Sequence, residues 1–193
     1  MVALGLIPTE DKRVPLSDGA GEIIEVGKDV SKWTIGDKVM SMCFPNWVSG
    51  PPKYDLLSFI GDNQDGYATE LISIPESAIT KIPNNLNFKE AATLPCAGLT
   101  AWRALVDEGR LKSGETVLVQ GTGGVSVFAL QLAKTFGATV IATSSSEEKL
   151  EKLKSLGADH LINYKAHPEW GKEVLKITNN LSLIHISEPT RQI

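Results

Sequence analysis

The stretch Thr116–Ser146, TVLVQGTGGVSVFALQLAKTFGATVIATSSS, constrains the fold more than any other part of the chain. It begins with an apolar, β-branched run, Val117–Val119, which is typical of a buried parallel strand. Glycines follow within Gly121–Gly124, and an apolar face at helical spacing then ends at Gly137. A second apolar run, Val140–Thr143, comes next. Strand, glycine turn, helix and strand in about thirty residues predict a βαβ unit.

A unit of this kind is suited to bind the pyrophosphate of a dinucleotide. The glycine turn lets phosphate approach the backbone, and the helix N-terminus offers unpaired N–H groups. The first two glycines of the G-x-G-x-x-G pattern are present, and Ser126 stands at the third position. The alternative is a plain glycine turn without a ligand. We predict that the cofactor contacts Gly121, Thr122, Gly123, Gly124 and Val125.

Composition and charge exclude several other classes of protein. The 193 residues are 42% hydrophobic and 22% charged, as in a globular protein. A net charge of −4 does not provide the positive surface of a nucleic-acid-binding protein. The sequence has neither an apolar run of transmembrane length nor a secretory signal peptide, and two cysteines make no disulfide framework. We expect a cytoplasmic protein that acts on a small molecule, with neither nucleic acid nor membrane as its partner.

The residues before the βαβ unit predict a different kind of sheet. Glu22–Val26, Lys38–Met42 and Gly66–Ile74 are short strand candidates, and Gly/Asp turns separate them. This pattern favours a small antiparallel, barrel-like domain. Asn87 and Glu90 then match the N-cap and third helical position of a capping box.

Further elements are predicted on both sides of the βαβ unit. Helices are expected over Lys89–Leu94, ended by Pro95, and over Leu99–Glu108. After the second strand we expect a helix, a strand and a helix, at 147–156, 160–163 and 169–177. Such alternation of strands and helices predicts a parallel sheet.

The last segment, residues 181–193, fits none of these patterns. LSLIHISEPTR within it resembles the translation of an adapter used in sequencing-library preparation. We therefore predict that a non-native tail begins after Asn180 and leave it out of the fold. The alternative is a genuine strand over Leu181–Ile186.

Four segments together resemble the medium-chain dehydrogenase/reductase superfamily, and most of all its zinc-poor alcohol dehydrogenase and quinone oxidoreductase-like branches. They are SDGAGEIIEVGKDVSKWTIGDKVM, GYATELISIP, FKEAATLPCAGLTAWRAL, and the run from ETVLVQGTGG to GADHLINY. The resemblance implies an α/β chain in which a partial chaperonin-10-like (GroES-like) β-barrel at residues 1–88 precedes the first half of a Rossmann sheet at residues 89–180.

The resemblance also implies that the chain is incomplete. The barrel would begin before Met1, and a whole Rossmann sheet would have about six strands. We expect the chain alone to be inactive and its intact parent to be a homodimer or homotetramer.

The end of the second strand bears on which nicotinamide cofactor is used. NAD-preferring Rossmann proteins carry an acidic residue there, which binds the ribose 2′-OH. This chain has Ser144, followed by Ser145 and Ser146, with Lys149 one turn into the next helix. Hydroxyls and a lysine suit a 2′-phosphate, so we predict that NADP(H) is preferred over NAD(H). Alternatively, Ser146 is only a helix N-cap and Lys149 only a solvated side chain.

The resemblance adds two residues to the cofactor site. Tyr164 matches the family tyrosine near the adenosine phosphate, and Thr100 matches the threonine near the nicotinamide. Either is equally well explained as an ordinary packing residue. No residue is identified as catalytic.

A catalytic zinc is not expected in this chain. Such a site needs three protein ligands and an open position. In the zinc enzymes of the family a histidine stands where this chain has Ser17. Cys96 matches another ligand position, but a single buried cysteine is more often a small hydrophobic residue. Because Cys43 is the only cysteine before Cys96, the four-cysteine structural zinc lobe is absent from the sequence given.

These features predict an NADP(H)-dependent oxidoreductase that transfers hydride to or from a quinone, an enone or an alcohol/aldehyde pair. Without zinc, such a protein would mainly position cofactor against substrate and exclude water. One alternative is a non-catalytic dinucleotide-binding protein of the same fold. Another is a methyltransferase, but these proteins usually carry an acidic residue where this chain has Ser144.

Overall fold

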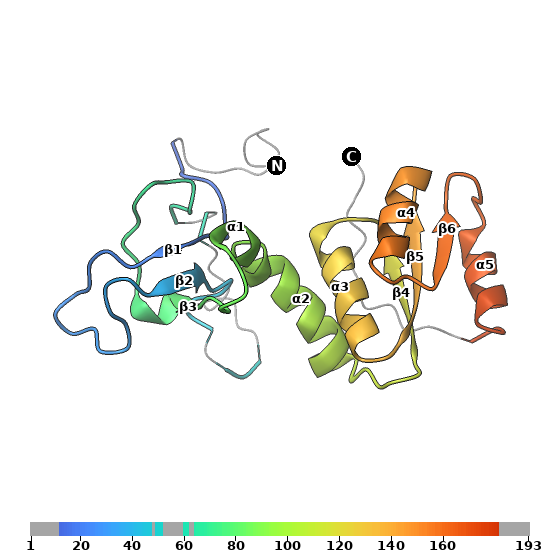
Figure 1. The fold of residues 1–193 in the computed structure, drawn as a ribbon, viewed down its shortest axis with the longest axis horizontal. Helices are drawn as coiled ribbons and strands as arrows, with labels where there is room; N and C mark the ends of the chain where they lie inside the picture. Colours follow the sequence, from blue (N-terminus) through green and yellow to red (C-terminus); the bar gives the residue numbers. More distant parts are fainter. Residues whose placement is uncertain (1–11, 48, 52–59, 62–63, 182–193) are drawn as a thin grey trace. The chain divides into compact units, whose positions relative to one another are not determined.

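The computed structural model describes residues 12–47, 49–51, 60–61 and 64–181, and the chain divides into two compact units (Figure 1). The units join in the sequence between Cys96 and Ala97. The first contains a three-stranded antiparallel sheet and the second a three-stranded parallel sheet. The predicted fold class, a partial barrel followed by the start of a Rossmann sheet, is confirmed.

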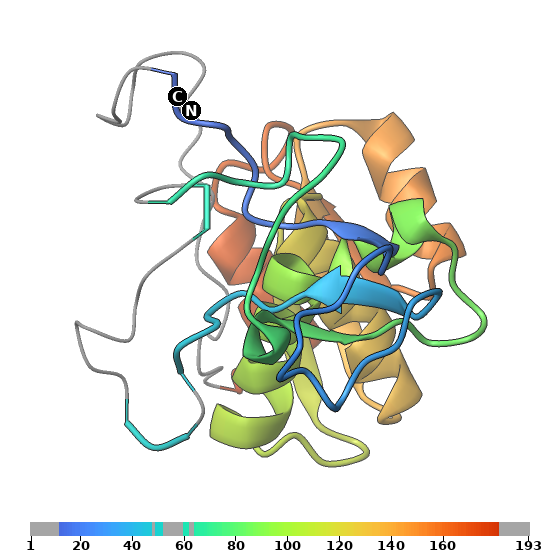
Figure 2. The same ribbon diagram turned by 90° about the vertical axis from the view of Figure 1, so that its left-hand side faces the viewer.

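The first unit is built on short strands (Figure 2), and its core is small. β1 (Ala20–Glu22) pairs with β2 (Lys38–Ser41), and β2 pairs with β3 (Ile79–Lys81), which follows the 3-10 turn η3 (Glu76–Ala78). The predicted strand at 22–26 shares only its first residue with β1. Three buried side chains form the core of this sheet: Trp33, Val39 and Ile79.

The prediction of a strand over Gly66–Ile74 is wrong, because the backbone of this segment makes an irregular set of hydrogen bonds. Gly66 and Ala68 donate their N–H groups to the carbonyls of Val14 and Pro15, and Thr69 turns back onto the carbonyl of Tyr67. The hydroxyl of Thr69 also donates to Leu71 at 3.0 Å. Local bonds of this kind compete with a regular ladder. The third strand of the sheet is instead β3, which the sequence pattern did not indicate.

The capping box is confirmed at the start of α1 (Phe88–Ala91). Asn87 Oδ1 accepts the N–H of Glu90 at 3.0 Å, and Glu90 Oε2 accepts the N–H of Asn87 at 3.0 Å. The two side chains thus satisfy two N–H groups that a helix start leaves without partners.

The helical segments after α1 are partly π-helical, which the sequence did not predict. Pro95 was expected to follow a helix end, but it lies in the first turn of the π-helical segment η4 (Leu94–Gly98). Proline is tolerated there because the N–H that it lacks has no partner in a first turn. α2 (Leu99–Trp102) and the π-helical η5 (Arg103–Glu108) together cover the predicted helix 99–108.

The second unit has the predicted order of strands and helices. Its parallel strands are ordered β4-β5-β6. The strands are β4 (Thr116–Gln120), β5 (Thr139–Ser144) and β6 (His160–Asn163). The helices are α3 (Gly124–Thr135), α4 (Glu147–Ser155) and α5 (Trp170–Ile177).

Side chains that alternate along β4 and β5 face two different cores. Val119 and Val140 pack with α3 and α4, whereas Leu118 and Ile141 belong to the cluster of α5 that includes Val174. α3 and α4 therefore cover one face of the sheet and α5 the other, as Figure 1 shows. This arrangement explains why the strands are apolar at consecutive positions.

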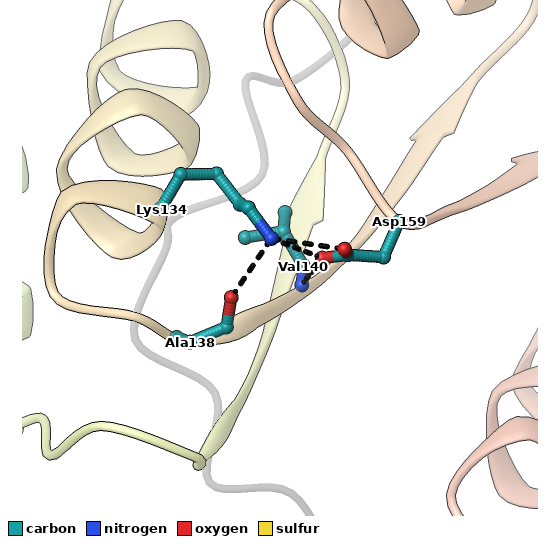
Figure 3. A network of polar contacts seen from close by, with 4 residues as sticks. All are labelled: Lys134, Ala138, Val140 and Asp159. Carbon is teal, nitrogen blue, oxygen red and sulfur yellow. Dashed lines mark hydrogen bonds and ion pairs between the residues drawn. The ribbon is translucent and has the colours of Figure 1, made fainter.

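A network of polar contacts links the amino-terminal end of β5 to the residues around it (Figure 3). Lys134 Nζ lies 2.8 Å from Asp159 Oδ2 and 3.2 Å from the carbonyl of Ala138. The same carboxylate accepts the N–H of Val140 at 2.7 Å. Burial disfavours the ionised carboxyl, but the ammonium and the N–H outweigh it, so the pKa of Asp159 lies below its ordinary value.

No helix among the described residues is long and apolar enough to cross a membrane. The predicted tail, residues 181–193, lies outside the described residues except for Leu181, so its origin stays a prediction.

We expect Asp159→Asn to destabilise the chain by about 1 kcal/mol at pH 7, because it removes a partly exposed ion pair. A carboxyl whose pKa is lowered in the folded state stabilises above its unfolded pKa, and this contribution is lost as the pH falls through the folded value. The difference between variant and wild type should therefore shrink below about pH 4. Urea unfolding followed by far-UV circular dichroism at several pH values measures it.

Glu148→Gln is the matched control, since Glu148 also lies 2.7 Å from a lysine, Lys152, but both side chains are more than 70% exposed. It should change stability little at any pH. Equal losses in the two variants, or a loss for Asp159→Asn that persists in acid, would contradict the assignment.

Candidate cofactor-binding site

The predicted cofactor residues of the βαβ region gather at the carboxyl-terminal edge of the parallel sheet. The N–H of Gly121, just after β4, donates to the carbonyl of Thr143 at 3.0 Å. The N–H of Tyr164, just after β6, donates to the carbonyl of Ser144 at 3.1 Å. The ends of the three strands are thus held side by side. This edge is where open α/β sheets bind their ligands.

The turn between β4 and α3 leaves a helix N-terminus open to an anion. Gly121 has φ +82°, a backbone conformation that favours glycine. Gly123 is the N-cap of α3 and has no side chain with which to bond the helix N–H groups. Ser126 is turned away, since its hydroxyl donates to the carbonyl of Gln120 at 2.8 Å. N–H groups in the first turn can therefore bind a pyrophosphate, so these residues fit a dinucleotide.

Close packing also restricts the start of α3. A Cβ placed on Gly124 would lie 3.2 Å from the Cβ of Ala97, so Ala97 lies directly against this turn. Ser126 is 5% exposed, and its small side chain fits where the pattern has a third glycine. Val125 is partly buried against the core, and its backbone lies in the first turn of α3. Thr100 is exposed in α2, a helical turn after Ala97.

The serines after β5 differ from one another. Ser144 is 2% exposed and sits within the sheet, whereas Ser145 and Ser146 are half-buried. Ser146 is the N-cap of α4, but its side chain bonds none of the helix N–H groups. Its hydroxyl is therefore not used in capping, which was the alternative interpretation. Lys149 is exposed on the first turns of α4, and Tyr164 is half-buried after β6.

Sequence reasoning missed a carboxylate at the same edge. Glu147, the first residue of α4, is exposed and accepts a hydrogen bond from Asn163 Nδ2. Asn163 is itself fixed, since its Oδ1 accepts the N–H groups of Lys165 at 3.0 Å and Ala166 at 3.3 Å. The prediction considered only the position of Ser144 for an acidic residue. The sequence did contain a signal for this carboxylate, because Glu147 is an acidic residue directly after the three serines, at the expected start of a helix.

The first unit holds the residues considered for zinc. Ser17 donates to one oxygen of the Asp18 carboxylate, and the other oxygen accepts the N–H of Cys96 at 2.7 Å. Burial, and to a lesser extent the charge of Asp18, raises the pKa of Tyr67, against a smaller opposing effect of Ser41. The described residues contain no group of three histidine, cysteine or acidic side chains placed to hold a metal. These residues do not fit a zinc ion, and its absence from the protein stays a prediction.

Two family models match the chain. The alcohol dehydrogenase GroES-like domain matches residues 4–84, and the zinc-binding dehydrogenase model matches residues 124–190. The second match continues past Asn180 into the predicted tail.

Relatives and solved structures agree with these matches. A zinc-type alcohol dehydrogenase-like protein from Schizosaccharomyces pombe is 46% identical over 94% of this chain and 54% of its own length. The crystal structure of an NAD-dependent alcohol dehydrogenase has 36% identity and a TM-score of 0.81, over 93% of this chain and 55% of that one. A quinone oxidoreductase structure from Pseudomonas syringae has 31% identity and a TM-score of 0.72, over 91% and 49%.

The chain thus spans about half the length of the relatives it matches. The matched proteins include alcohol dehydrogenases, a quinone oxidoreductase and a 2-methylene-furan-3-one reductase, which supports an oxidoreductase in general. The fold and the relatives indicate the same family. The fold has a GroES-like unit and a Rossmann-type parallel sheet with an open glycine turn. The chain belongs to the medium-chain dehydrogenase/reductase superfamily.

Proposed function

We propose that this chain belongs to an NADP(H)-dependent oxidoreductase that transfers hydride to or from a quinone, an enone or an alcohol/aldehyde pair. The observation that carries the proposal is the N-terminus of α3, which Gly123 leaves without a side-chain cap at the carboxyl edge of the sheet. The substrate classes come from the relatives, which include a quinone oxidoreductase and an alcohol dehydrogenase. The parent protein would act as a homodimer or homotetramer in the cytoplasm.

When bound, the nicotinamide cofactor would supply the hydride or accept it. The residues of this chain would hold the cofactor in place. N–H groups of Gly124 and Val125 in the first turn of α3 would bind the pyrophosphate, because the positive end of the helix dipole lies there. Gly121, whose φ is +82°, would let the chain turn tightly before α3 without adding a side chain there.

The proposed preference for NADP(H) rests on the start of α4. Ser145, Ser146 and Lys149 offer two hydroxyls and a flexible ammonium near the end of β5. The buried Ser144 would contribute its backbone rather than its hydroxyl. Tyr164 and Thr100 remain candidates for the adenosine phosphate and the nicotinamide.

A non-catalytic dinucleotide-binding protein of the same fold is the second candidate. Its support is that none of the described residues stands out as a proton donor at the cofactor edge. Turnover by the full-length parent distinguishes the two. NADPH oxidation with any member of a panel of quinones, enones and aldehydes supports the enzyme, and tight NADPH binding without turnover supports the alternative.

We predict that Gly123→Ala weakens NADPH binding by about tenfold or more, because the new methyl group enters the space where phosphate approaches the helix. Gly123 has φ −75° and ψ 172°, which alanine adopts freely, so the fold should be kept. Fluorescence titration with NADPH gives the dissociation constant.

Gly171→Ala in α5 is the control, since a Cβ there meets no atom within 4 Å. It should leave NADPH affinity unchanged. If Gly123→Ala binds NADPH as tightly as the wild type does, the pyrophosphate is not held at this turn.

For Lys149→Ala we expect about a tenfold weaker affinity for NADPH and little change for NADH, because only NADPH carries the 2′-phosphate. Lys152→Ala is the matched control on the same helix, since that lysine is paired with Glu148. Equal dissociation constants of the wild type for NADPH and NADH, or equal losses for both cofactors in Lys149→Ala, would refute the preference.

A further inference from the structure

The carboxylate of Glu147 is held by a hydrogen bond beside the candidate cofactor edge. Asn163 Nδ2 donates to Glu147 Oε1 across 16 positions of the sequence. The pairing of the strands explains this contact, because Asn163, the last residue of β6, lies opposite Ser144, the last residue of β5. α4 then begins at Glu147, close to the same strand ends.

The amide of Asn163 is oriented by its own loop. Its Oδ1 accepts the N–H groups of Lys165 at 3.0 Å and Ala166 at 3.3 Å. Its backbone carbonyl accepts the N–H of His167 at 2.9 Å, so the turn after β6 closes on this one residue. Because Oδ1 is used as an acceptor within the turn, the NH₂ group is the part of the amide that is left for Glu147.

The hydrogen bond places the Glu147 carboxylate on one side of β5. In the sheet, β5 lies between β4 and β6. The glycine turn after β4 contacts β5 from one side, through the N–H of Gly121 and the carbonyl of Thr143 at 3.0 Å. Asn163 binds Glu147 on the β6 side. The carboxylate is therefore held on the side opposite the turn at which we expect the pyrophosphate.

The first turns of α4 separate this carboxylate from the nearby ammonium. Glu147 and Lys149 are both exposed, and they stand two positions apart on the helix. Residues two positions apart on an α-helix project about 200° from one another. Lys149 is thus placed on the side of α4 away from Glu147, so the two charges do not face each other.

We propose that Asn163 determines cofactor specificity as a positioning residue, by holding the Glu147 carboxylate away from the adenosine ribose. A carboxylate that selects NAD accepts hydrogen bonds from the ribose hydroxyls. Glu147 is the first acidic residue after β5, and Asn163 engages one of its two oxygens. A released Glu147 would bind the ribose of NADH and repel the 2′-phosphate of NADPH. This inference rests on the proposed use of a nicotinamide dinucleotide at this edge.

The test is a double-mutant cycle on the full-length parent, with the dissociation constants of NADPH and NADH measured by fluorescence titration. Asn163→Ala should shift the ratio of the two constants toward NADH by about fivefold or more, because it frees a charged hydrogen-bond acceptor. In a Glu147→Gln background the same substitution should leave the ratio unchanged, since no carboxylate remains to be held. A merely structural role would weaken the binding of both cofactors together and leave the ratio unchanged in either background.

Asn163→Asp separates the lost donor from a disturbed loop. It keeps the oxygen that accepts the N–H groups of Lys165 and Ala166, but it has no N–H to donate to Glu147. It should therefore shift the ratio at least as far as Asn163→Ala does. Circular dichroism of each variant verifies that it folds.

Glu148→Gln is the matched control, because it removes a carboxylate one position away that is paired with Lys152 instead. It should change the ratio by less than about twofold. The proposal is overturned if Asn163→Ala keeps the wild-type ratio, or if it shifts the ratio equally with and without Glu147. Equal affinity of the wild type for NADPH and NADH would instead refute the proposed preference for NADP(H), whereas the shift caused by Asn163→Ala tests Asn163 independently.

Discussion

The parallel pairing of β4 with β5 is the constraint on which the second unit depends. Parallel neighbours cannot be joined by a tight hairpin, so the chain must leave the sheet, cross one face as a helix and return. α3 makes this crossing, and its first turn is thereby fixed at the carboxyl end of β4. The register from Thr116 with Thr139 to Gln120 with Thr143 then sets the serines after β5 beside the glycine turn. The position of the candidate anion site thus follows from the topology of the sheet.

The two ends of this sheet have different roles. At the amino-terminal end of β5, the Asp159 carboxylate accepts hydrogen bonds from the Lys134 ammonium and from the N–H of Val140 (Figure 3). These polar groups are therefore bonded to one another within the protein. At the carboxyl end, the first turn of α3 and the N-cap Ser146 are left without side-chain caps. Groups that are satisfied within the protein stabilise it, whereas groups left unsatisfied are available to a ligand.

Elements with a local signal could be predicted from the sequence. The βαβ unit, the capping box of Asn87 and Glu90, and β6 were all found, because spacing within a few residues defines each of them. β3 was missed because three residues, Ile79–Lys81, carry too little pattern to mark a strand. The predicted strand at 66–74 has β-forming residues, but its N–H groups bond to an irregular neighbouring segment.

Contacts between distant residues could not be predicted in this way. No spacing relates Asp18 to Cys96, whose hydrogen bond crosses 78 positions of the sequence. Such pairs depend on how the strands and turns pack together. The candidate cofactor edge could be predicted in part. The sequence pattern identified Ser145 and Lys149 there, but Glu147 was recognised only from its hydrogen bond with Asn163 in the structure.

The choice between the two cofactors then depends on competing charges at the start of α4. Glu147 would repel a 2′-phosphate, but its carboxylate is already bound by the amide of Asn163. The exposed ammonium of Lys149 and the positive end of the α4 dipole act in the opposite direction. A carboxylate that selects NAD must direct its oxygens at the ribose hydroxyls, and Asn163 engages one oxygen of Glu147. We therefore propose that the attraction outweighs the repulsion, in agreement with the proposed preference for NADP(H).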